Sequence, residues 1–357
     1  MKAWLKRIGI IIGLILTVLI GAGFWTEMDH ATLTSYMSQP ELETVKPGWP
    51  GTPVDQEGRF MNHEFPMVMK TSRFLRWQFS SNLFEDEKAK DTWRPNVADP
   101  TEFLNSDRDG LVWLGHATFY IRLNGVTILT DPIFGEPALV DRYVDLPSPL
   151  AKIRNVGYVL LSHDHRDHMD EPTLLLLANK FPDARFLAGM RSEELLRDFV
   201  TPTNDIGTAG WFQRFDLGTS PVEIYFLPVR HWSRRGLFDT NHRLWGGFVI
   251  KGGETSIYFG GDSGYGRHYR ETGGLFPEID YFLIGIGAYE PRWFMEPNHN
   301  NPADVVKAFK DIGARTLVPM HYGTFDLSDE PPSAPLRELT KEAEASGITD
   351  RVKTLDL

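Results

Sequence analysis

The sequence has no cysteine among its 357 residues, which excludes disulfide bonds, thiolate metal sites, a cysteine nucleophile and a lipid anchor on cysteine. Basic residues are also in the minority, with 37 Lys and Arg against 48 Asp and Glu and a formal net charge of −11. Because a phosphate backbone needs a basic protein surface, this balance argues against a nucleic-acid partner. The hydrophobic share of 41% is enough for a substantial core and excludes bulk disorder.

An apolar run stands near the N-terminus, where 18 uncharged residues extend from Ile8 to Trp25. A helix of about 18–20 residues just spans a bilayer core. Charged residues flank the run, basic before it and acidic after it: Lys2, Lys6, Arg7, Glu27 and Asp29. This asymmetry predicts that residues 1–29 form a single-pass membrane anchor, with a cytoplasmic N-terminus and the rest of the chain outside, periplasmic or extracellular.

A cleaved secretory signal is the alternative for this segment, with the small residues Gly21, Ala22 and Gly23 at the processing site. The protein would then be secreted. The length of the run and Trp25, a residue type typical of membrane interfaces, favour the uncleaved anchor. A buried core helix is disfavoured directly behind a basic N-terminus.

Two segments separate this run from the main part of the chain. Residues 30–58 contain Pro40, Pro47, Pro50 and Pro53 and are predicted as a linker. Residues 59–108 carry many large apolar side chains and form a lead-in segment. Two interpretations of the lead-in stay open: it packs on the flank of the main domain, or it offers an apolar surface that takes part in lipid binding.

Residues 109–357 are predicted as one domain of the α+β class, because short β-rich runs begin at Gly110 and alternate with helical stretches. Strands are predicted at 111–114, 118–123, 126–130, 156–161, 222–229, 247–251, 256–259, 281–284 and 316–319. Helices are predicted at about 171–180, 192–200, 302–312 and 335–345. Since both halves contain strands and helices, we expect a sandwich of two mixed sheets flanked by helices.

A dense group of metal-binding residue types follows the apolar run 156–162. Within six residues the chain supplies His163, His165, Asp167 and His168, with Asp164 among them. Imidazole nitrogen and carboxylate oxygen are ligands that Zn²⁺ prefers, and His also suits iron. Four such ligands on one short turn indicate two metal ions side by side, one on the first two histidines and the other on Asp167 and His168.

Three more residues of these types stand just past predicted strands, namely His231, Asp262 and His321. Loops at one end of a rigid sandwich are where functional sites are usually built. We therefore expect a binuclear centre with Asp262 as the bridge between the metals. Its other ligands are His163, His165 and His231 on one metal and Asp167, His168 and His321 on the other.

The order His-x-His-x-Asp-His, then a lone His, then Gly-Asp, then a final His resembles the metallo-β-lactamase superfamily. Further motifs are similar to its branch of N-acyl-phosphatidylethanolamine-hydrolysing phospholipases D. They are Trp-Leu-Gly-His-Ala-Thr at 113–118, Leu-Thr-Asp-Pro-Ile-Phe at 129–134, Arg-His-Trp at 230–232, Gly-Asp-Ser-Gly-Tyr at 261–265, Gly-Ala-Tyr-Glu-Pro-Arg-Trp-Phe-Met at 287–295 and His-Tyr-Gly-Thr-Phe at 321–325. The resemblance covers roughly residues 110–325.

This resemblance implies a four-layer αβ/βα sandwich and a metal-dependent hydrolase with two Zn²⁺ per chain, although the same ligands accept iron or manganese. The implied reaction is phospholipase D-type hydrolysis of (N-acyl-)phosphatidylethanolamine to phosphatidate and the (N-acyl)ethanolamine. A hydroxide that bridges the metals would be the nucleophile, so no protein nucleophile is needed. The implied partners are a phospholipid substrate and the membrane, and a homodimer stays open.

Within that reaction, Asp262 and His299 are candidate catalytic residues, and His299 is also a candidate substrate contact. Tyr289 and Arg292 are further candidates for contacting substrate at the mouth of the site. Residues that hold ligands or loop backbone in place are expected at His116, Asp131 and Asp164.

A local basic cluster accompanies the predicted ligand His231 and consists of Arg230, Arg234 and Arg235. Two interpretations stay open, because the cluster is suited to receive a phosphate or an anionic membrane surface, and a solvated loop has the same composition.

Two other functions compete with the phospholipase interpretation. One is a hydrolase of the same fold that acts on a lactone or a soluble phosphodiester. The other is a non-catalytic membrane-bound scaffold that keeps metals only for folding. The full ligand set speaks against the scaffold, because a purely structural zinc usually has a closed tetrahedral site.

Overall fold

The structure is a computed structural model that describes residues 32–357 except 66–68, 70, 138–139 and 146–148. The predicted membrane anchor, residues 1–29, lies outside the described residues. Within the described part of the chain, no helix is both long and apolar enough to cross a bilayer.

The first of two six-stranded sheets has the strand order β3-β4-β5-β6-β7-β8. Its strands are β3 (Gly110–Trp113), β4 (Phe119–Leu123), β5 (Val126–Thr130), β6 (Tyr158–Leu161), β7 (Arg185–Gly189) and β8 (Ile206–Ala209). Strands β3 to β5 are antiparallel, and β5 to β8 are parallel. Its outer face carries α5 (Pro149–Lys152), α6 (Glu171–Lys180) and α7 (Glu193–Phe199).

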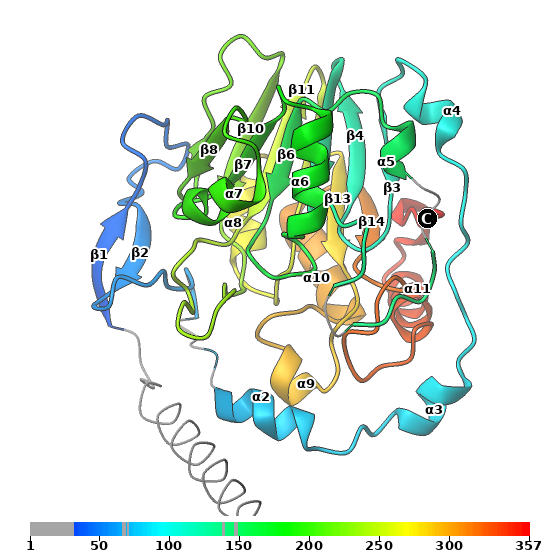
Figure 1. Cartoon of the computed structure of the whole chain (residues 1–357). Helices are drawn as coiled ribbons and strands as arrows, with labels where there is room; N and C mark the ends of the chain where they lie inside the picture. Colours follow the sequence, from blue (N-terminus) through cyan, green and yellow to red (C-terminus); the bar gives the residue numbers. More distant parts are fainter. Residues whose placement is uncertain (1–31, 66–68, 70, 138–139, 146–148) are drawn as a thin grey trace, which may run out of the picture.

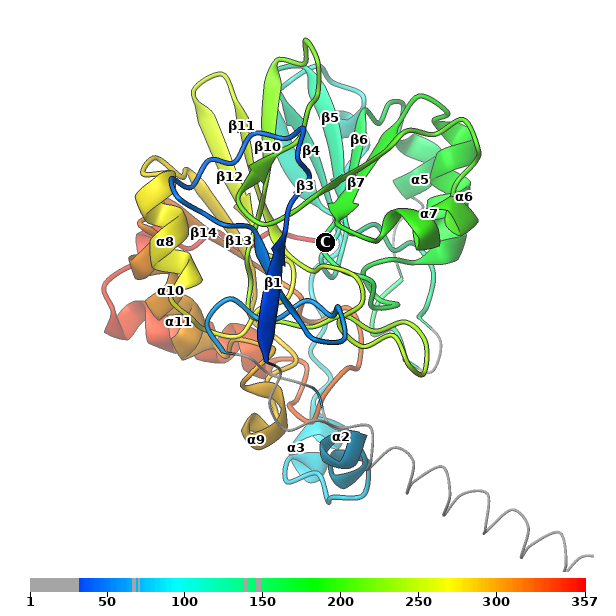
Figure 2. The same ribbon diagram turned by 90° about the vertical axis from the view of Figure 1, so that its left-hand side faces the viewer.

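The second sheet repeats this scheme with the order β14-β13-β12-β11-β10-β9. Its strands are β9 (Gln213–Arg214), β10 (Val222–Leu227), β11 (Gly247–Gly252), β12 (Thr255–Phe259), β13 (Tyr281–Gly285) and β14 (Thr316–Met320). Its outer helices are α8 (His268–Leu275), α10 (Pro302–Ile312) and α11 (Ala334–Ala345). Figure 2 shows the sheets between the two groups of helices, which confirms the predicted sandwich.

Alternate residues of the first sheet face two different cores, as the two-residue period of a strand requires. Ile121 and Leu160 lie in the cluster between the sheets, together with Phe226 and Phe248 of the second sheet. Their chain neighbours belong to the cluster under α6 and α7, for example Leu161. The strands are buried on both faces, which is why their sequences are almost continuously apolar.

Within residues 109–357, the sequence-based prediction misses β7, β8, β9 and α8, and also the short helices α5, α9 (Arg292–Met295) and η1 (Thr349–Arg351). Strand β7 is rich in small residues, and α8 contains Gly273, a poor helix former. The structure explains this glycine, because a Cβ atom there would lie 2.3 Å from the carbonyl oxygen of Ile312. Close helix packing therefore outweighs helix propensity at α8.

The segment predicted as a linker, residues 30–58, instead forms part of the folded body from residue 33 onward. Strands β1 (Leu33–Met37) and β2 (Thr52–Asp55) pair antiparallel, and all four residues of β2 are buried. The side chain of Gln213 donates to the carbonyl oxygen of Gln39 at 2.7 Å. Prolines interrupt regular structure here, but the apolar and amide contacts still fix the chain.

The lead-in segment, residues 59–108, contains α2 (Thr71–Gln78), α3 (Glu85–Lys90) and α4 (Thr101–Leu104). Helix α2 lies beside the short helix α9 (Arg292–Met295) at one end of the molecule (Figure 1). There Trp77 stacks on Phe294, with ring centroids 5.1 Å apart, and its indole donates to Asp329. These contacts hold the lead-in at the end of the sandwich where the loops after β6, β12 and β14 also lie.

Residues 296–301 connect α9, at this end of the molecule, to α10, and Asn301 caps the N-terminus of α10. The Asn301 side chain accepts from the Asp304 N–H at 2.8 Å, and Asp304 also accepts from Arg292. We expect Asn301→Ala to lower the free energy of unfolding by about 1 kcal/mol, because the cap bond is lost. Denaturant unfolding measures this. Asn179→Ala, on the exposed side of α6, serves as control, and equal effects of both changes would contradict the role of the cap.

Candidate metal centre

The turn after β6 is fixed by hydrogen bonds before any metal binds. The Ser162 N–H and hydroxyl donate to the two oxygens of Asp131, at 2.7 and 2.5 Å. The N–H groups of His168 and Met169 both donate to the carbonyl oxygen of His165. The side chains of the motif therefore leave the turn in set directions.

Three imidazoles converge at one side of the centre. The Nε2 atom of His163 lies 2.8 Å from Nδ1 of His165, which lies 3.2 Å from Nε2 of His231. Ligand nitrogens of a tetrahedral zinc are separated by about 3.3 Å, given metal–nitrogen distances of roughly 2.0–2.1 Å. Both separations are close to the value that a shared metal requires, and the three nitrogens lie within 4.8 Å of one another.

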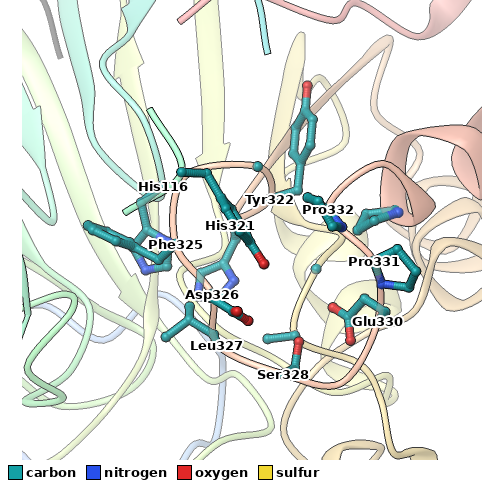
Figure 3. A pocket seen from close by; sticks show the side chains of 15 residues that line it. His116, His321, Tyr322, Phe325, Asp326, Leu327, Ser328, Glu330, Pro331 and Pro332 are labelled. Carbon is teal, nitrogen blue, oxygen red and sulfur yellow. The ribbon is translucent and has the colours of Figure 1, made fainter. Parts of the chain in front are cut away.

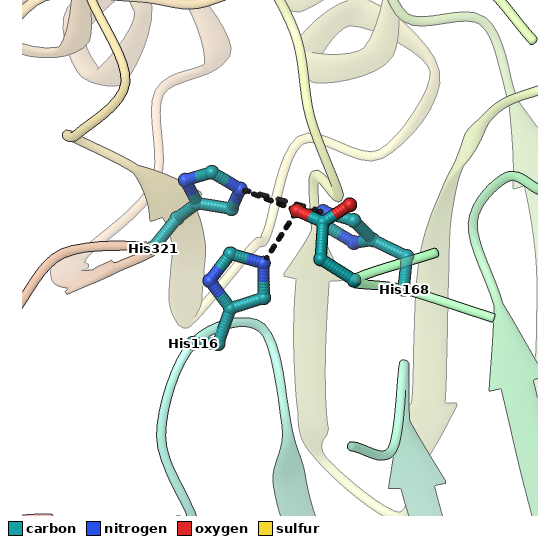
Figure 4. A group of neighbouring side chains, drawn as sticks. His116, His168 and His321 are labelled. Carbon is teal, nitrogen blue, oxygen red and sulfur yellow. Dashed lines mark hydrogen bonds and ion pairs between the residues drawn. The ribbon is translucent and has the colours of Figure 1, made fainter. Parts of the chain in front are cut away.

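A second group lies beside the first and contains Asp167, His168, His321 and His116. The Nε2 atoms of His168 and His321 are 3.3 Å apart, and Asp167 Oδ2 is 3.5 Å from His168 Nε2 and 3.9 Å from that of His321. Figure 4 shows the three labelled imidazoles turned toward one carboxylate. His116 Nε2 contacts the same carboxylate at 3.0 Å, so His116 holds Asp167 in place.

The carboxylate of Asp262 lies between the two groups. It is 3.2 Å from His168 Nε2 and 3.1 Å from His321 Nε2, and 3.9 Å from the Nε2 atoms of His163 and His231. Its Oδ1 atom is buried and its contact with His321 Nε2 does not form a hydrogen bond. A buried carboxylate oxygen that accepts no hydrogen bond is costly unless a cation satisfies it. The structure therefore brings together all seven predicted ligands in an arrangement that fits two metal ions.

Close backbone approach makes this arrangement possible. A Cβ atom at Gly261, whose φ is +52°, would lie 2.6 Å from the Cβ of Ser162, so only glycine lets the Asp262 turn reach the His163 turn. Positive φ also occurs at His116, Asp131 and His321. Such backbone costs of order 1–3 kcal/mol per residue and concentrates at functional sites.

Burial sets the charge of the first group. It lowers the pKa of His163 and His231 well below the ordinary value, and the neighbouring histidines lower it further. Neutral imidazoles are the form that binds metal. Burial raises the pKa of Asp262, but the surrounding His168, His321 and His299 outweigh it and keep this pKa well below its usual range. The first group thus offers neutral nitrogens beside an ionised carboxylate, whereas Asp262 and Asp167 outweigh burial at His168 and raise its pKa well above the ordinary value.

Other residues orient the ligand rings. Asp131 Oδ2 lies 2.7 Å from His168 Nδ1, and the carbonyl oxygen of Asn298 lies 3.1 Å from His231 Nδ1. The side chain of Asn62 forms hydrogen bonds with both the N–H and the carbonyl of His231. Sequence reasoning proposed Asp131 for this type of role. It missed Asn62 and Asn298, because no local pattern marks either residue.

A cavity of about 650 Å³ opens over the centre. His165, Asp167, Asp262 and His321 lie at its floor, with His299. The Nδ1 atom of His299 is 3.9 Å from Asp262 Oδ2, and burial lowers the pKa of His299 to about 4. The walls are mostly apolar and come from α2, α9 and nearby loops: Met69, Phe74, Leu75, Trp77, Trp232, Phe294, Met295 and Leu327.

Tyr289 and Arg292, predicted to contact substrate at the mouth, are not among the residues that line this cavity. Tyr289 is buried, and its N–H donates to Glu330, so the loop turns this side chain inward. Arg292 donates to Asp304 at 2.8 Å and to the carbonyl oxygen of His299 at 3.2 Å. Its contact with His299 is therefore through the backbone. Asp164, as predicted for a loop-fixing residue, accepts from the Arg234 N–H and from Arg243.

A second hollow lies behind His321 and is lined by the segment 321–332 (Figure 3). Its volume of about 20 Å³ has room for about one water molecule. Of these two spaces, only the large cavity has room for a substrate.

Comparisons with known proteins agree with this geometry. A family model described as a beta-lactamase superfamily domain matches residues 126–322. The N-acyl-phosphatidylethanolamine-hydrolyzing phospholipase D 1 of Caenorhabditis elegans is 31% identical over 267 residues, which are 71% of this chain and 75% of that protein. The chain belongs to the metallo-β-lactamase superfamily. Within it, the chain groups with the N-acyl-phosphatidylethanolamine-hydrolysing phospholipase D branch.

Solved structures of this superfamily share the fold. Igni18, a metallo hydrolase from the archaeon Ignicoccus hospitalis, superposes with a TM-score of 0.52 at 19% identity and covers 69% of this chain and 94% of its own. CmlA, a diiron β-hydroxylase from Streptomyces venezuelae, gives 0.53 at 20% identity and covers 71% and 53%. This metallo-β-lactamase superfamily member is thus a metal-dependent hydrolase, and the fold alone does not select zinc over iron.

Metal affinity should follow the contacts above. We expect His163→Ala to abolish metal binding by the first group. Asp131→Asn should weaken metal affinity by about 10- to 100-fold, because the new side chain no longer orients His168. Metal content after dialysis against graded chelator measures both effects, and circular dichroism checks that the variants fold. The exposed His242, changed to Ala, is the control. Unchanged metal content in His163→Ala would contradict the assignment.

Proposed function

We propose that this protein is a membrane-tethered phosphodiesterase with two zinc ions that hydrolyses (N-acyl-)phosphatidylethanolamine to phosphatidate and the (N-acyl)ethanolamine. One observation supports this most: the cavity that leads to the metal-binding groups has apolar walls over a charged floor. A phospholipid has the same division, with acyl chains beside a phosphodiester. The similarity to the phospholipase of Caenorhabditis elegans supports the same substrate class.

The residues at the floor of the cavity have different roles in the proposed reaction. Two bound metal ions would supply a water of lowered pKa and would offset negative charge on the phosphoryl oxygens. Asp262 lies between both metal-binding groups and is placed to join them. His299 faces Asp262 from the cavity side, and its low pKa keeps it neutral at pH 7. The neutral His299 ring can therefore donate a hydrogen bond to the substrate phosphate, and it can donate one to the leaving group or accept one from it.

A hydrolase of a soluble phosphodiester or a lactone is the second candidate. This candidate is supported by the fold that the chain shares with the metallo hydrolase Igni18. The superposition covers most of the Igni18 chain, at low sequence identity. The apolar walls favour the lipid, because a small polar substrate gains nothing from them. The third candidate, a non-catalytic scaffold, does not account for a cavity that reaches the ligands.

The predicted anchor at residues 1–29 belongs to this proposal. A tether raises the local concentration of a bilayer substrate around the active site. With the anchor retained, we propose that the catalytic domain lies outside the cytoplasm, in the periplasm or the extracellular space, and that a cleaved segment would give a secreted form.

The role of His299 can be separated from metal binding. We expect His299→Ala to retain the metals and to lose turnover by about 100-fold or more, as is typical when a general acid or base is removed. Metal content and steady-state hydrolysis are measured on the same preparation. Unchanged turnover would end the assignment, and loss of metal would make His299 a ligand instead.

The apolar wall gives a test of substrate class. Phe74 lines the cavity and is 45% exposed, and Leu175 on α6 is 47% exposed and does not line it. We expect Phe74→Ser to raise KM for phospholipid roughly tenfold, through lost apolar contact, and to leave hydrolysis of a soluble phosphodiester unchanged. Leu175→Ser should change neither. Equal effects of both variants on the lipid would contradict acyl-chain binding in this cavity.

The proposed reaction is tested with the metal-loaded full-length protein and liposomes that contain N-acyl-phosphatidylethanolamine or phosphatidylethanolamine. Mass spectrometry should detect phosphatidate together with the free head group, and chelation should abolish both products. Intact lipid from protein that carries its metals would refute the phospholipase proposal, and hydrolysis of soluble esters by that protein would favour the second candidate.

A further inference from the structure

The loop 234–239 is held rigidly at the rim of the cavity. Arg234, Arg235 and Gly236 line the cavity, and the Asp239 carboxylate closes the turn by accepting from the N–H of Gly236 at 2.7 Å and of Arg235 at 3.2 Å. Arg243 then bridges Asp239 and the buried Asp164, at 2.7 and 2.9 Å. The loop is therefore anchored to the metal-binding turn itself, which contains Asp164.

The tip of this loop presents two large apolar side chains to solvent. Leu237 is 75% exposed and Phe238 is 91% exposed. Beyond α2, whose Phe74, Leu75 and Trp77 line the same cavity, the chain exposes Phe79 by 87% and Leu83 by 90%. Single exposed apolar residues are common on proteins. Two such pairs, each close in the chain to residues that line one cavity, indicate a surface that something apolar covers.

Three arginines surround the same rim without a carboxylate partner among the described residues. Arg166 lines the cavity, is exposed and forms no ion pair there. The guanidinium of Arg234 donates to carbonyl oxygens of its own loop, and that of Arg235 donates to the carbonyl oxygens of Asp164 and Met169. Three guanidinium groups without an ion pair at this rim contrast with the net charge of −11 of the whole chain.

We propose that the 234–239 loop and the end of α2 dock on the surface of a bilayer that contains anionic lipids. Exposed apolar side chains enter the interface, and guanidinium groups beside them attract anionic head groups. The docked face is the one that opens the cavity, so a lipid reaches the metal centre without crossing water. The proposal rests on the proposed function only for this last step, since docking itself needs no hydrolysis.

Charge complementarity favours a bilayer over a second copy of the chain. A symmetric contact between two copies through this face would bring the same arginines together on both sides. Like charges across an interface are unfavourable, whereas an anionic lipid surface offers the opposite charge.

The absence of native cysteine allows a direct test in the full-length protein. Phe238→Cys is labelled with an environment-sensitive fluorophore and compared with labelled Leu176→Cys, which is 52% exposed on α6. Both proteins are reconstituted in vesicles of phosphatidylcholine with or without phosphatidylserine, and iodide quenching is measured. We expect the label at 238, and not at 176, to be shielded from iodide in the anionic vesicles, with shielding reduced at high salt.

The charge requirement is tested by adding Arg166→Gln to the Phe238→Cys protein. We expect the docking equilibrium to weaken by roughly fivefold, as for one basic residue near an anionic surface. Equal iodide access at 238 and 176 in anionic vesicles would overturn the proposal. Shielding at 238 that rises with protein concentration in detergent, without lipid, would assign the face to a second copy instead. Because no outcome depends on turnover, failure of docking and failure of the proposed reaction are distinguishable.

Discussion

The carboxylate of Asp131 connects the first sheet to the metal centre. It is fully buried, and burial raises its pKa even though Ser162 and His168 stabilise the charged form. A buried carboxylate needs its hydrogen bonds satisfied. Two residues of the metal-binding turn satisfy the Asp131 carboxylate, namely Ser162, at the start of the turn, and the imidazole of His168. One interaction therefore joins the ends of β5 and β6 and sets the direction of His168.

The rest of the centre follows from the same constraint. Several imidazoles and ionised carboxylates are enclosed in one buried space, and such a group is unfavourable unless cations balance it. Strained backbone at His116 and His321 is held by a hydrogen bond from the His321 N–H to the His116 carbonyl oxygen. The polar floor is thus rigid before substrate arrives. The apolar walls come partly from the lead-in segment and partly from α9, Trp232 and Leu327, so floor and walls have largely separate origins in the chain.

The polar floor and the apolar walls differ in how far the sequence predicts them. The ligands were predictable, because His and Asp stand at strand ends and strand ends of one sandwich meet. The apolar lead-in left two interpretations open, flank packing or lipid binding, and its position over the centre depends on the packing of Trp77 on Phe294. The inward turn of Tyr289 and the contact of Asn62 with His231 depend on chain segments far apart in sequence. No local pattern encodes such contacts, so sequence reasoning misplaced the first and missed the second.

The most direct test of this account is anomalous diffraction from crystals of the metal-loaded protein, recorded at the zinc and iron absorption edges. We expect two anomalous peaks, one among His163, His165 and His231 and one among Asp167, His168 and His321, with the Asp262 carboxylate between them. The edge at which the peaks appear identifies the metal. A single peak away from Asp262, or no peak in a protein that hydrolyses phosphodiesters, would contradict the binuclear centre.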